Sequence, residues 1–325
     1  MPQPSISYAC GRVGVLKRSQ LGQAQIERLL AAPQPAEAER ALVDIGFMAA
    51  DQTDYQAAAD LHINKACKLI KAVTTDTAMT DCFFYRYDVH NLKVLIKSRH
   101  LAHAPEFLSA CGSIDVETLK HCVADRTYVQ LPPELAEGLK KLEKRIAVEF
   151  DPLLIDAELD KAMYRQIFQN LKGRESTLAY RYFEAKADLQ NLIMLLRVRD
   201  MDKESAFFAA LALDGGKAGK QNFVRAFADN DQLVRMVGVY GMKVKQAAQA
   251  ATLDSKKLPY LEKVADDYLY GLFKPYRYEA ASVEVLLAYL LLRQREAADV
   301  RLIMTGKING FSNEDVQERV RELNG

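Results

Sequence analysis

The sequence has no long apolar run and no excess of charge of either sign. Its longest apolar stretch, Val285 to Leu292, is about half the length that a membrane-spanning helix needs. The N-terminal residues lack the apolar core of a secretory signal. We therefore expect a cytoplasmic protein that does not cross a membrane. The 44 lysines and arginines nearly cancel the 43 aspartates and glutamates. The basic excess typical of nucleic-acid-binding proteins is missing, so we expect no nucleic-acid partner.

Cysteines are few, and their spacing suits neither a disulfide framework nor a zinc site. None of the five stands in a CxxC pair or at the spacing of zinc ligands. They are Cys10, Cys67, Cys82, Cys111 and Cys122. We expect free and mostly buried thiols in a reducing compartment.

Motifs of known catalytic and nucleotide-binding sites are also missing. Gly219-Lys220 and Gly306-Lys307 lack the upstream glycine and the following serine or threonine of a phosphate-binding loop. The sequence contains no GxGxxG and no GxSxG. His90 with Asp88 suggests a helical metal-dependent hydrolase, but residues two apart do not share a helix face. We therefore predict a protein without catalytic residues, metal, cofactor or small-molecule substrate.

What the sequence does have is a helical period along almost its whole length. Apolar residues recur at i, i+3 and i+4, as in Leu92, Leu95 and Ile96, and good helix formers dominate. Strand alternation is nearly absent, so the predicted fold class is all-α. Helix breaks are expected at Pro33-Gln34-Pro35, Leu131-Pro132-Pro133, Asp214 to Gly219, Lys274-Pro275, and Asn309-Gly310, with Ser312 and the residues after it starting a last helix.

One motif recurs along the chain. Asp88 to Arg99 and Asp188 to Arg199 both read DxxNLxxLhxxR, with h an apolar residue, at an offset of 100 residues. An aspartate stands 28 residues before each copy, at Asp60 and Asp160. The motif positions are Asp88, Asn91 and Leu92, then Asp188, Asn191 and Leu192, and in a weaker third copy Glu296, Asp299 and Arg301, whose upstream partner is Asp266 or Asp267. We predict three helical domains, residues 1–105, 106–205 and 206–325.

A second register competes with this one. Tyr-Arg-Tyr occurs at residues 85–87, 180–182 and 276–278. It directly precedes Asp88 but stands several residues before Asp188, so the two registers cannot both mark equivalent positions. The DxxNL register matches more positions and preserves the helix face, and we prefer it.

The spacing of the motif favours a structural role. Asp88 and Asn91 are three apart and share a helix face beside the apolar stripe. A short carboxylate and an amide there can hydrogen-bond the exposed backbone at the end of a neighbouring helix. Lys97 and Arg99 fall in the last turn, where they favour the negative end of the helix dipole, as do Arg197 and Arg199 in the second copy. We predict helix-to-helix docking within each unit rather than a ligand site.

Four segments carry a family resemblance: Tyr8 to Arg12, Tyr87 to Lys93, Asp188 to Arg199, and Glu296 to Gly310. Together they resemble the C-subunit family of prokaryotic V-type (A/V-type) rotary ATPases, relatives of the eukaryotic d subunit. The last segment is similar to the family pattern E-x-x-N-[IL]-R-x-I-x-x-G-K-x-x-G. Asp299 stands where asparagine is common in that pattern, and an acidic helix, here Asn313 to Leu323, is expected after it.

The resemblance implies a funnel of three pseudo-equivalent helical domains. It implies that the protein sits on the cytoplasmic face of the membrane proteolipid ring, receives the foot of the central stalk and transmits torque. Members of this family have no catalytic residues, bind no nucleotide and need no cofactor. The alternative left open is a helical-repeat adaptor unrelated to rotary motors.

Overall fold

All the regular secondary structure that the structure describes is helical. The structure, a computed structural model, describes residues 5–16, 21–278 and 281–323, without the side chains of residues 277 and 278. In these ranges there are α-helices and short 3-10 helices but no β-strand, and the all-α prediction is confirmed.

The chain divides into two compact units, residues 1–76 with 262–325 and residues 77–261. The helices of the first unit are α1 (Ile6–Leu16), α2 (Gln23–Ala31), α3 (Pro35–Asp44), α4 (Tyr55–Val73), most of α15 (Leu258–Gly271), η4 (Lys274–Tyr278), α16 (Val283–Ile308) and α17 (Asn313–Gln317). Those of the second unit are α5 (Thr77–Asp81), α6 (Tyr85–Leu101), α7 (Val116–Asp125), α8 (Pro133–Ile146), α9 (Pro152–Asn170), α10 (Leu178–Asp200), α11 (Ser205–Leu211), α12 (Lys220–Arg225), α13 (Asn230–Val237), η2 (Gly238–Tyr240), α14 (Met242–Leu253) and η3 (Ser255–Lys257). The three domains with boundaries at 105 and 205 remain a prediction.

The helix boundaries follow local chemistry. Pro35 and Pro133 open α3 and α8, where a missing backbone N–H costs nothing. The Asp54 carboxylate accepts from the N–H groups of the first turn of α4.

The last helix is shorter than predicted. It has the expected Ser312 N-cap but ends at Gln317, whereas the resemblance predicted a helix to Leu323. The expectation was wrong at that end because the backbone of Arg321 and Glu322 bonds to side chains of α16 and α15.

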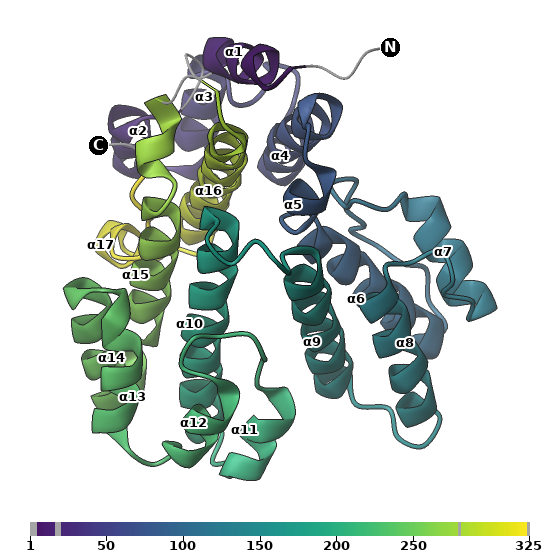
Figure 1. The fold of residues 1–325 in the computed structure, drawn as a ribbon. Coiled ribbons are helices and arrows are strands. Elements are labelled where there is room, and N and C mark those ends of the chain that lie inside the picture. Colours follow the sequence, from purple (N-terminus) through teal and green to yellow (C-terminus); the bar gives the residue numbers. More distant parts are fainter. Residues whose placement is uncertain (1–4, 17–20, 279–280, 324–325) are drawn as a thin grey trace. The chain divides into compact units, whose positions relative to one another are not determined.

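Helix α16 is the centre of the first unit. It packs against α1, α2, α3, α4 and α17, and Figure 1 shows it alongside α4. The apolar run Val285 to Leu292 lies in its first half and is buried throughout. The run is therefore a core segment. In the part of the chain that the structure describes, helices of the length and hydropathy that a bilayer requires are absent.

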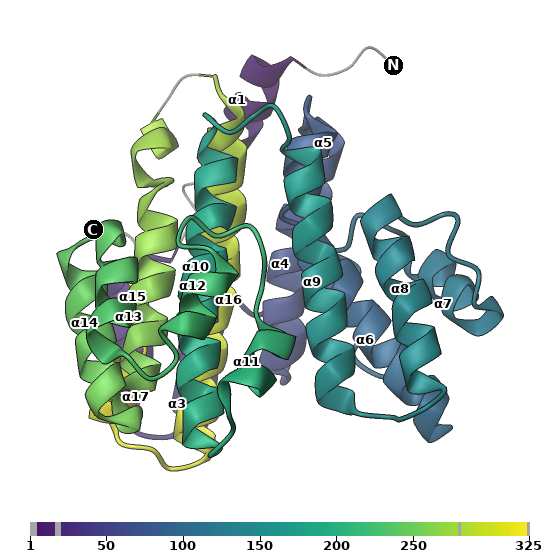
Figure 2. The ribbon, with the colours of Figure 1, turned by 60° about the horizontal axis from the view of Figure 1, so that its bottom comes forward.

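The second unit is built around two helices that carry the repeated motif. Helix α6 packs against α7 and α9, and α9 packs in turn against α8, so that α6, α8 and α9 run side by side in Figures 1 and 2. Helix α10 contacts α9, α11, α12 and α13. Leu92 on α6 and Leu192 on α10 have no exposed surface, which makes them core residues of this unit.

Candidate functional site

The two asparagines of the motif each hold the backbone of a single residue. Asn91 accepts from the N–H of Ser109 at 2.7 Å and donates to its carbonyl oxygen at 2.8 Å. Asn191 does the same with Leu213, at 2.8 and 2.9 Å. A side-chain amide has both a donor and an acceptor, so it can satisfy both polar groups of one residue. The motif therefore fixes the connection that follows each helix.

The aspartates of the motif bind the same connections a few residues further on. Asp88 accepts from the N–H groups of Ser113 and Ile114 at 2.8 and 3.0 Å, just before α7 begins. Asp188 accepts from the N–H of Ala218 at 2.7 Å, just before α12, and from the hydroxyl of Tyr240 at 2.6 Å. Burial raises the pKa of Asp188, and the bond from Tyr240 opposes that rise.

Two glycines make this approach possible. A Cβ atom on Gly112 would lie 2.1 Å from Oδ1 of Asp88, and one on Gly216 would lie 1.9 Å from Oδ1 of Asp188. Both distances are far below van der Waals contact. The backbone at each position can come this close to the carboxylate only because the residue has no side chain.

An arginine near the end of each motif helix binds the far end of the short helix. Arg99 donates to the carbonyl oxygen of Val123 at 2.6 Å, in the last turn of α7. Arg199 donates from Nε to the carbonyl oxygen of Phe227 at 2.6 Å, just after α12. Carbonyl groups at helix ends have no partner within the helix, and a cation suits the negative end of the dipole. The motif helix thus holds a short helix at both ends. We call this arrangement the helix clamp.

The third clamp holds a helix from the other end of the sequence. Glu296 accepts from the N–H of Leu21 at 2.8 Å, just before α2. Lys307 stands eight residues after Asp299, as Arg99 does after Asn91. It donates to the carbonyl oxygens of Leu30 and Ala32 at 2.8 and 2.5 Å, where α2 ends. Helix α2 therefore takes the place on α16 that α7 has on α6.

The asparagine position of the third clamp is occupied by Asp299. The N–H of Arg321 donates to its Oδ1 at 3.2 Å. Asp299 thus binds the C-terminal segment, and Glu296, three residues earlier, binds Leu21. Leu21 and Arg321, from opposite ends of the sequence, are therefore both bound by acids on one face of α16.

Glu296 lies in a buried charged cluster. Its Oε2 accepts from Nη1 of Arg293 at 2.9 Å and lies 2.7 Å from Nε2 of His62 on α4. The side chain of Arg293 is 5% exposed and that of Glu296 is not exposed. Arg293 also donates to the carbonyl oxygen of Leu16 at 2.9 Å. The cluster ties α16 to α4 and to the end of α1.

The upstream aspartates pair with a basic residue of a motif helix. Asp160 lies 2.6 Å from Nζ of Lys93, and Asp60 lies 2.6 Å from Nη2 of Arg301. Lys93 and Arg301 both stand two residues after the asparagine position of the motif, which is Asn91 in the first copy and Asp299 in the third. The matching residue of the second copy is Ile193, which cannot form the pair.

His90 and Asp88, the pair that suggested a metal-dependent hydrolase, bind different segments of the chain. In the described ranges, groups of three or more histidines, cysteines and acids able to hold a metal ion are absent. His90 contacts the carbonyl oxygen of Phe107 at 3.0 Å, whereas Asp88 binds the connection before α7. The five cysteines are free and buried, as predicted.

The clamp partners were missed in the sequence because they are mostly backbone groups, which leave no residue-type signal. The glycines were the one available signal. Gly112 and Gly216 follow Asp88 and Asp188 at similar sequence separations. A glycine that recurs after a recurring acid indicates that the backbone passes close to another group at that position. The residues that sequence reasoning did not connect with the motif are Leu21, Ser109, Gly112, Leu213, Gly216, Tyr240, Lys307 and Arg321.

Comparison with known proteins assigns the chain to a family. The family model described as ATP synthase (C/AC39) subunit matches residues 9–319. The C subunit of the V-type sodium ATPase of Enterococcus hirae is 24% identical over 276 residues, which cover 83% of each chain. The C subunit of the A-type ATP synthase of Methanosarcina mazei is 23% identical over 265 residues, covering 73% of this chain and 68% of that one. The chain belongs to the ATP synthase (C/AC39) subunit family.

Proposed function

We propose that this protein is the socket that joins the central shaft of a rotary ATPase to the membrane proteolipid ring. As a member of its family it is a non-catalytic stalk subunit of a rotary ATPase, as the sequence predicted. That membership excludes the alternative of a helical adaptor unrelated to rotary motors. The finer assignment, to the shaft on one side and the ring on the cytoplasmic face of the membrane on the other, is the proposal.

The observation that carries the proposal is the family match over nearly the whole chain. The helix clamps agree with such a role. A part that transmits torque must resist deformation, and each clamp gives the end of a short helix hydrogen-bond partners on a long helix. Asp88, Asp188 and Glu296 have no exposed surface, so the carboxylate of each clamp is shielded from water.

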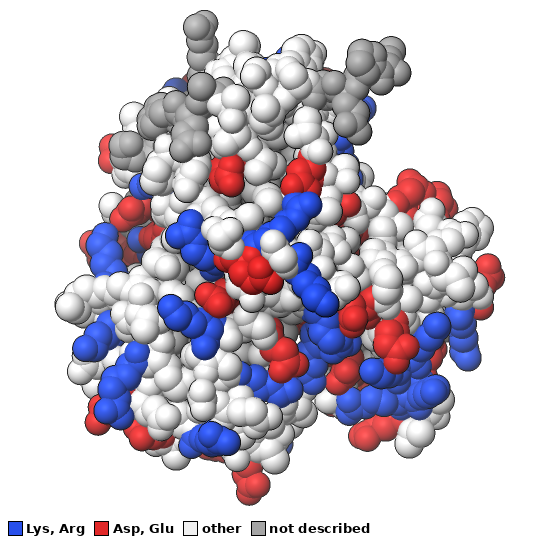
Figure 3. Space-filling model, in the orientation of Figure 1, with Lys and Arg blue, Asp and Glu red and all other residues white. Residues whose placement is uncertain are grey.

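The charged face over α8 and α9 suits protein partners better than a polyanion. On the face in Figure 3, basic and acidic side chains lie side by side over α8 and α9. Arg145 lies 2.9 Å from Glu158, and Arg165 lies 3.2 Å from Glu134. Alternating charges of this kind produce no extended field of one sign for nucleic acid or an anionic membrane.

A binding experiment tests the proposal. The purified chain is mixed separately with the central-stalk complex and with the detergent-solubilised proteolipid ring of the same source, and each mixture is separated by size. We expect the chain to co-elute with both, and to hydrolyse no ATP by itself. A folded chain that elutes alone from both mixtures would contradict the proposal. Co-elution with the stalk complex alone would contradict the ring contact.

A further inference from the structure

The C-terminal segment is fastened by a carboxylate where the other two clamps use an amide. Asn91 and Asn191 each accept from and donate to the backbone of one residue. Asp299 has the matching position and no exposed surface. An ionised carboxylate has no proton to donate, so it can form only the accepting half of this arrangement.

The contacts of Asp299 show only the accepting half of the arrangement. Oδ1 accepts from the N–H of Arg321 at 3.2 Å. Oδ2 is buried and has no hydrogen-bond partner. A buried, unpaired carboxylate oxygen is destabilising because it has lost its water without gaining a donor.

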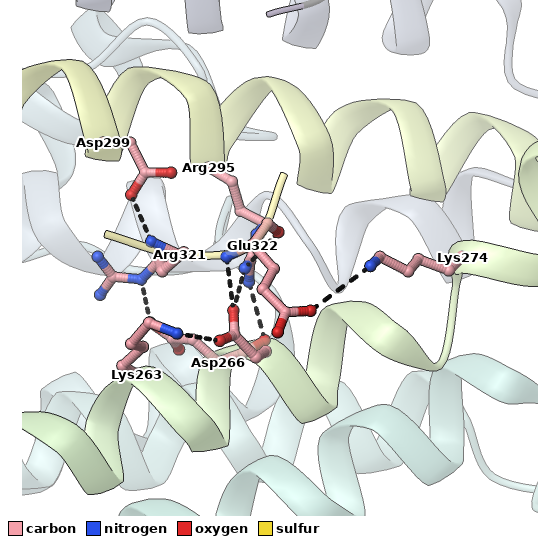
Figure 4. Close-up of polar contacts among 8 residues, drawn as sticks. Lys263, Asp266, Lys274, Arg295, Asp299, Arg321 and Glu322 are labelled. Carbon is pink, nitrogen blue, oxygen red and sulfur yellow. Dashed lines mark hydrogen bonds and ion pairs between the residues drawn. The ribbon is translucent and has the colours of Figure 1, made fainter. Parts of the chain in front are cut away.

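The surrounding cations are already engaged with other carboxylates. The charged groups that face this region are Arg295 on α16, Lys263, Asp266 and Asp267 on α15, Lys274 in η4, and Arg321 and Glu322 in the C-terminal segment (Figure 4). Arg295 pairs with Asp267 and also donates to the carbonyl oxygen of Glu322 at 2.8 Å. Nε of Arg321 donates to Asp266 at 2.7 Å. In this described region each arginine near Asp299 thus has an acid of its own.

The same surroundings change the acidity of the group. Burial raises the pKa of Asp299 to about 7. The backbone N–H of Arg321 and the charge of Arg295 act in the opposite direction and only partly offset this rise in pKa. An aspartate in an unfolded chain has a pKa of about 4. The folded state therefore binds the proton more tightly. By linkage, the contribution of this group to stability is largest below about pH 4 and is lost as the pH rises through 7.

We propose that Asp299 is a proton-dependent latch for the C-terminal segment. When Oδ2 takes up a proton from solvent, the acid gains the donor that the amides of Asn91 and Asn191 have. In the proposed latch this donor turns to the carbonyl oxygen of Arg321, as the amides donate to those of Ser109 and Leu213. When the proton returns to solvent, a buried charge remains with one backbone bond, and the segment from residue 318 to 323 is released more readily from α15 and α16.

Hydrogen exchange of the full chain tests the latch. The readout is the protection of the peptide covering residues 311–325, corrected for the intrinsic exchange rate at each pH. In the wild type we expect protection at pH 5.5 to exceed that at pH 8 by on the order of tenfold or more, given the two pKa values. The Asp299→Asn variant has the amide permanently, so it should be protected equally at both pH values. Asp299→Ala, without donor or acceptor, should be poorly protected at both.

An internal control is present in the same data. Ser109 is held by the amide of Asn91, which does not titrate, so its peptide should show no such change in protection. If Asp299→Asn loses protection between pH 5.5 and pH 8 as the wild type does, the latch is refuted. A carboxyl carbon NMR titration gives a second measurement: a midpoint of about 7 for Asp299 supports the latch, and a midpoint of about 4 overturns it.

Discussion

Lys307 donates a hydrogen bond to the carbonyl oxygen of Leu30 at 2.8 Å, so the last motif helix holds the end of a helix near the start of the chain. This contact corresponds to the one between Arg99 on α6 and Val123 on α7, two residues that are close in sequence. The third helix clamp is therefore completed by the N-terminal segment. The stability of the first unit should depend on the α16 side chains that hold α2 and the segment around Arg321.

Removing the amide of an asparagine clamp should destabilise the second unit. Asn91→Ala leaves the N–H and carbonyl groups of Ser109 without their partner. We expect a loss of about 1–3 kcal/mol in the free energy of unfolding, measured by urea denaturation. The exposed Gln130 of the same unit provides the control, since Gln130→Ala should change stability by less than about 0.5 kcal/mol. Equal effects of the two variants would show that the amide is not a clamp.

A methyl group at either clamp glycine should be poorly tolerated. Gly112→Ala and Gly216→Ala place a Cβ about 2 Å from the Asp88 or Asp188 carboxylate, so the connection must shift. We expect each to lower stability by about 1–3 kcal/mol in thermal or urea denaturation. Gly271, whose added Cβ would meet no atom within 4 Å, is the matched control. It lies at the end of α15, where alanine should be neutral or stabilise by up to about 1 kcal/mol. A stable Gly112→Ala variant would contradict the close approach.

Truncating Glu296 should strongly destabilise the first unit. Glu296→Ala removes the acceptor of Leu21 and leaves the buried Arg293 cation without its carboxylate. The expected loss is about 3–5 kcal/mol, because the buried cation loses its carboxylate partner. Glu296→Gln retains an acceptor for Leu21 and should cost less. The exposed Glu318→Ala serves as the control and should be nearly neutral. A Glu296→Ala variant as stable as Glu318→Ala would rule out the charged cluster as a source of stability.

The cation that holds α2 should matter more than an exposed lysine. Lys307→Ala removes the bonds to Leu30 and Ala32 and should lower the free energy of unfolding by about 1.5–3 kcal/mol. Lys307→Arg, with its own donors, should retain most of that stability. Lys257 is exposed, and Lys257→Ala is expected to stay within about 0.5 kcal/mol of the wild type. If Lys307→Arg were as damaging as Lys307→Ala, the helix-end bond would not be the cause.

The sequence was sufficient to predict the helices and the face on which the motif lies. Apolar periodicity and the i, i+3 spacing of Asp88 and Asn91 are local properties, and local patterns survive in the folded chain. Proline at the starts of α3 and α8 is likewise a local signal. The early end of α17 was missed because it depends on bonds from Arg321 and Glu322 to distant helices.

The partners of the motif could not be predicted for a different reason. Asn91, Asp88 and Arg99 bind backbone groups, and any residue except proline supplies the same N–H and carbonyl. The third clamp is harder still, because Glu296 and Leu21 are 275 residues apart. Only the fold brings α2 to the position on α16 that α7 has on α6.

The most direct test of the central claim is ATP-driven ion transport by a reconstituted motor. Proteolipid rings in liposomes with the other membrane subunits are combined with the soluble head and central stalk, with and without this chain. We predict that the head hydrolyses ATP in both cases, and that ions are transported only when the chain is present, because without it the shaft is not joined to the ring. Equal rates of ion transport with and without the chain would contradict the account.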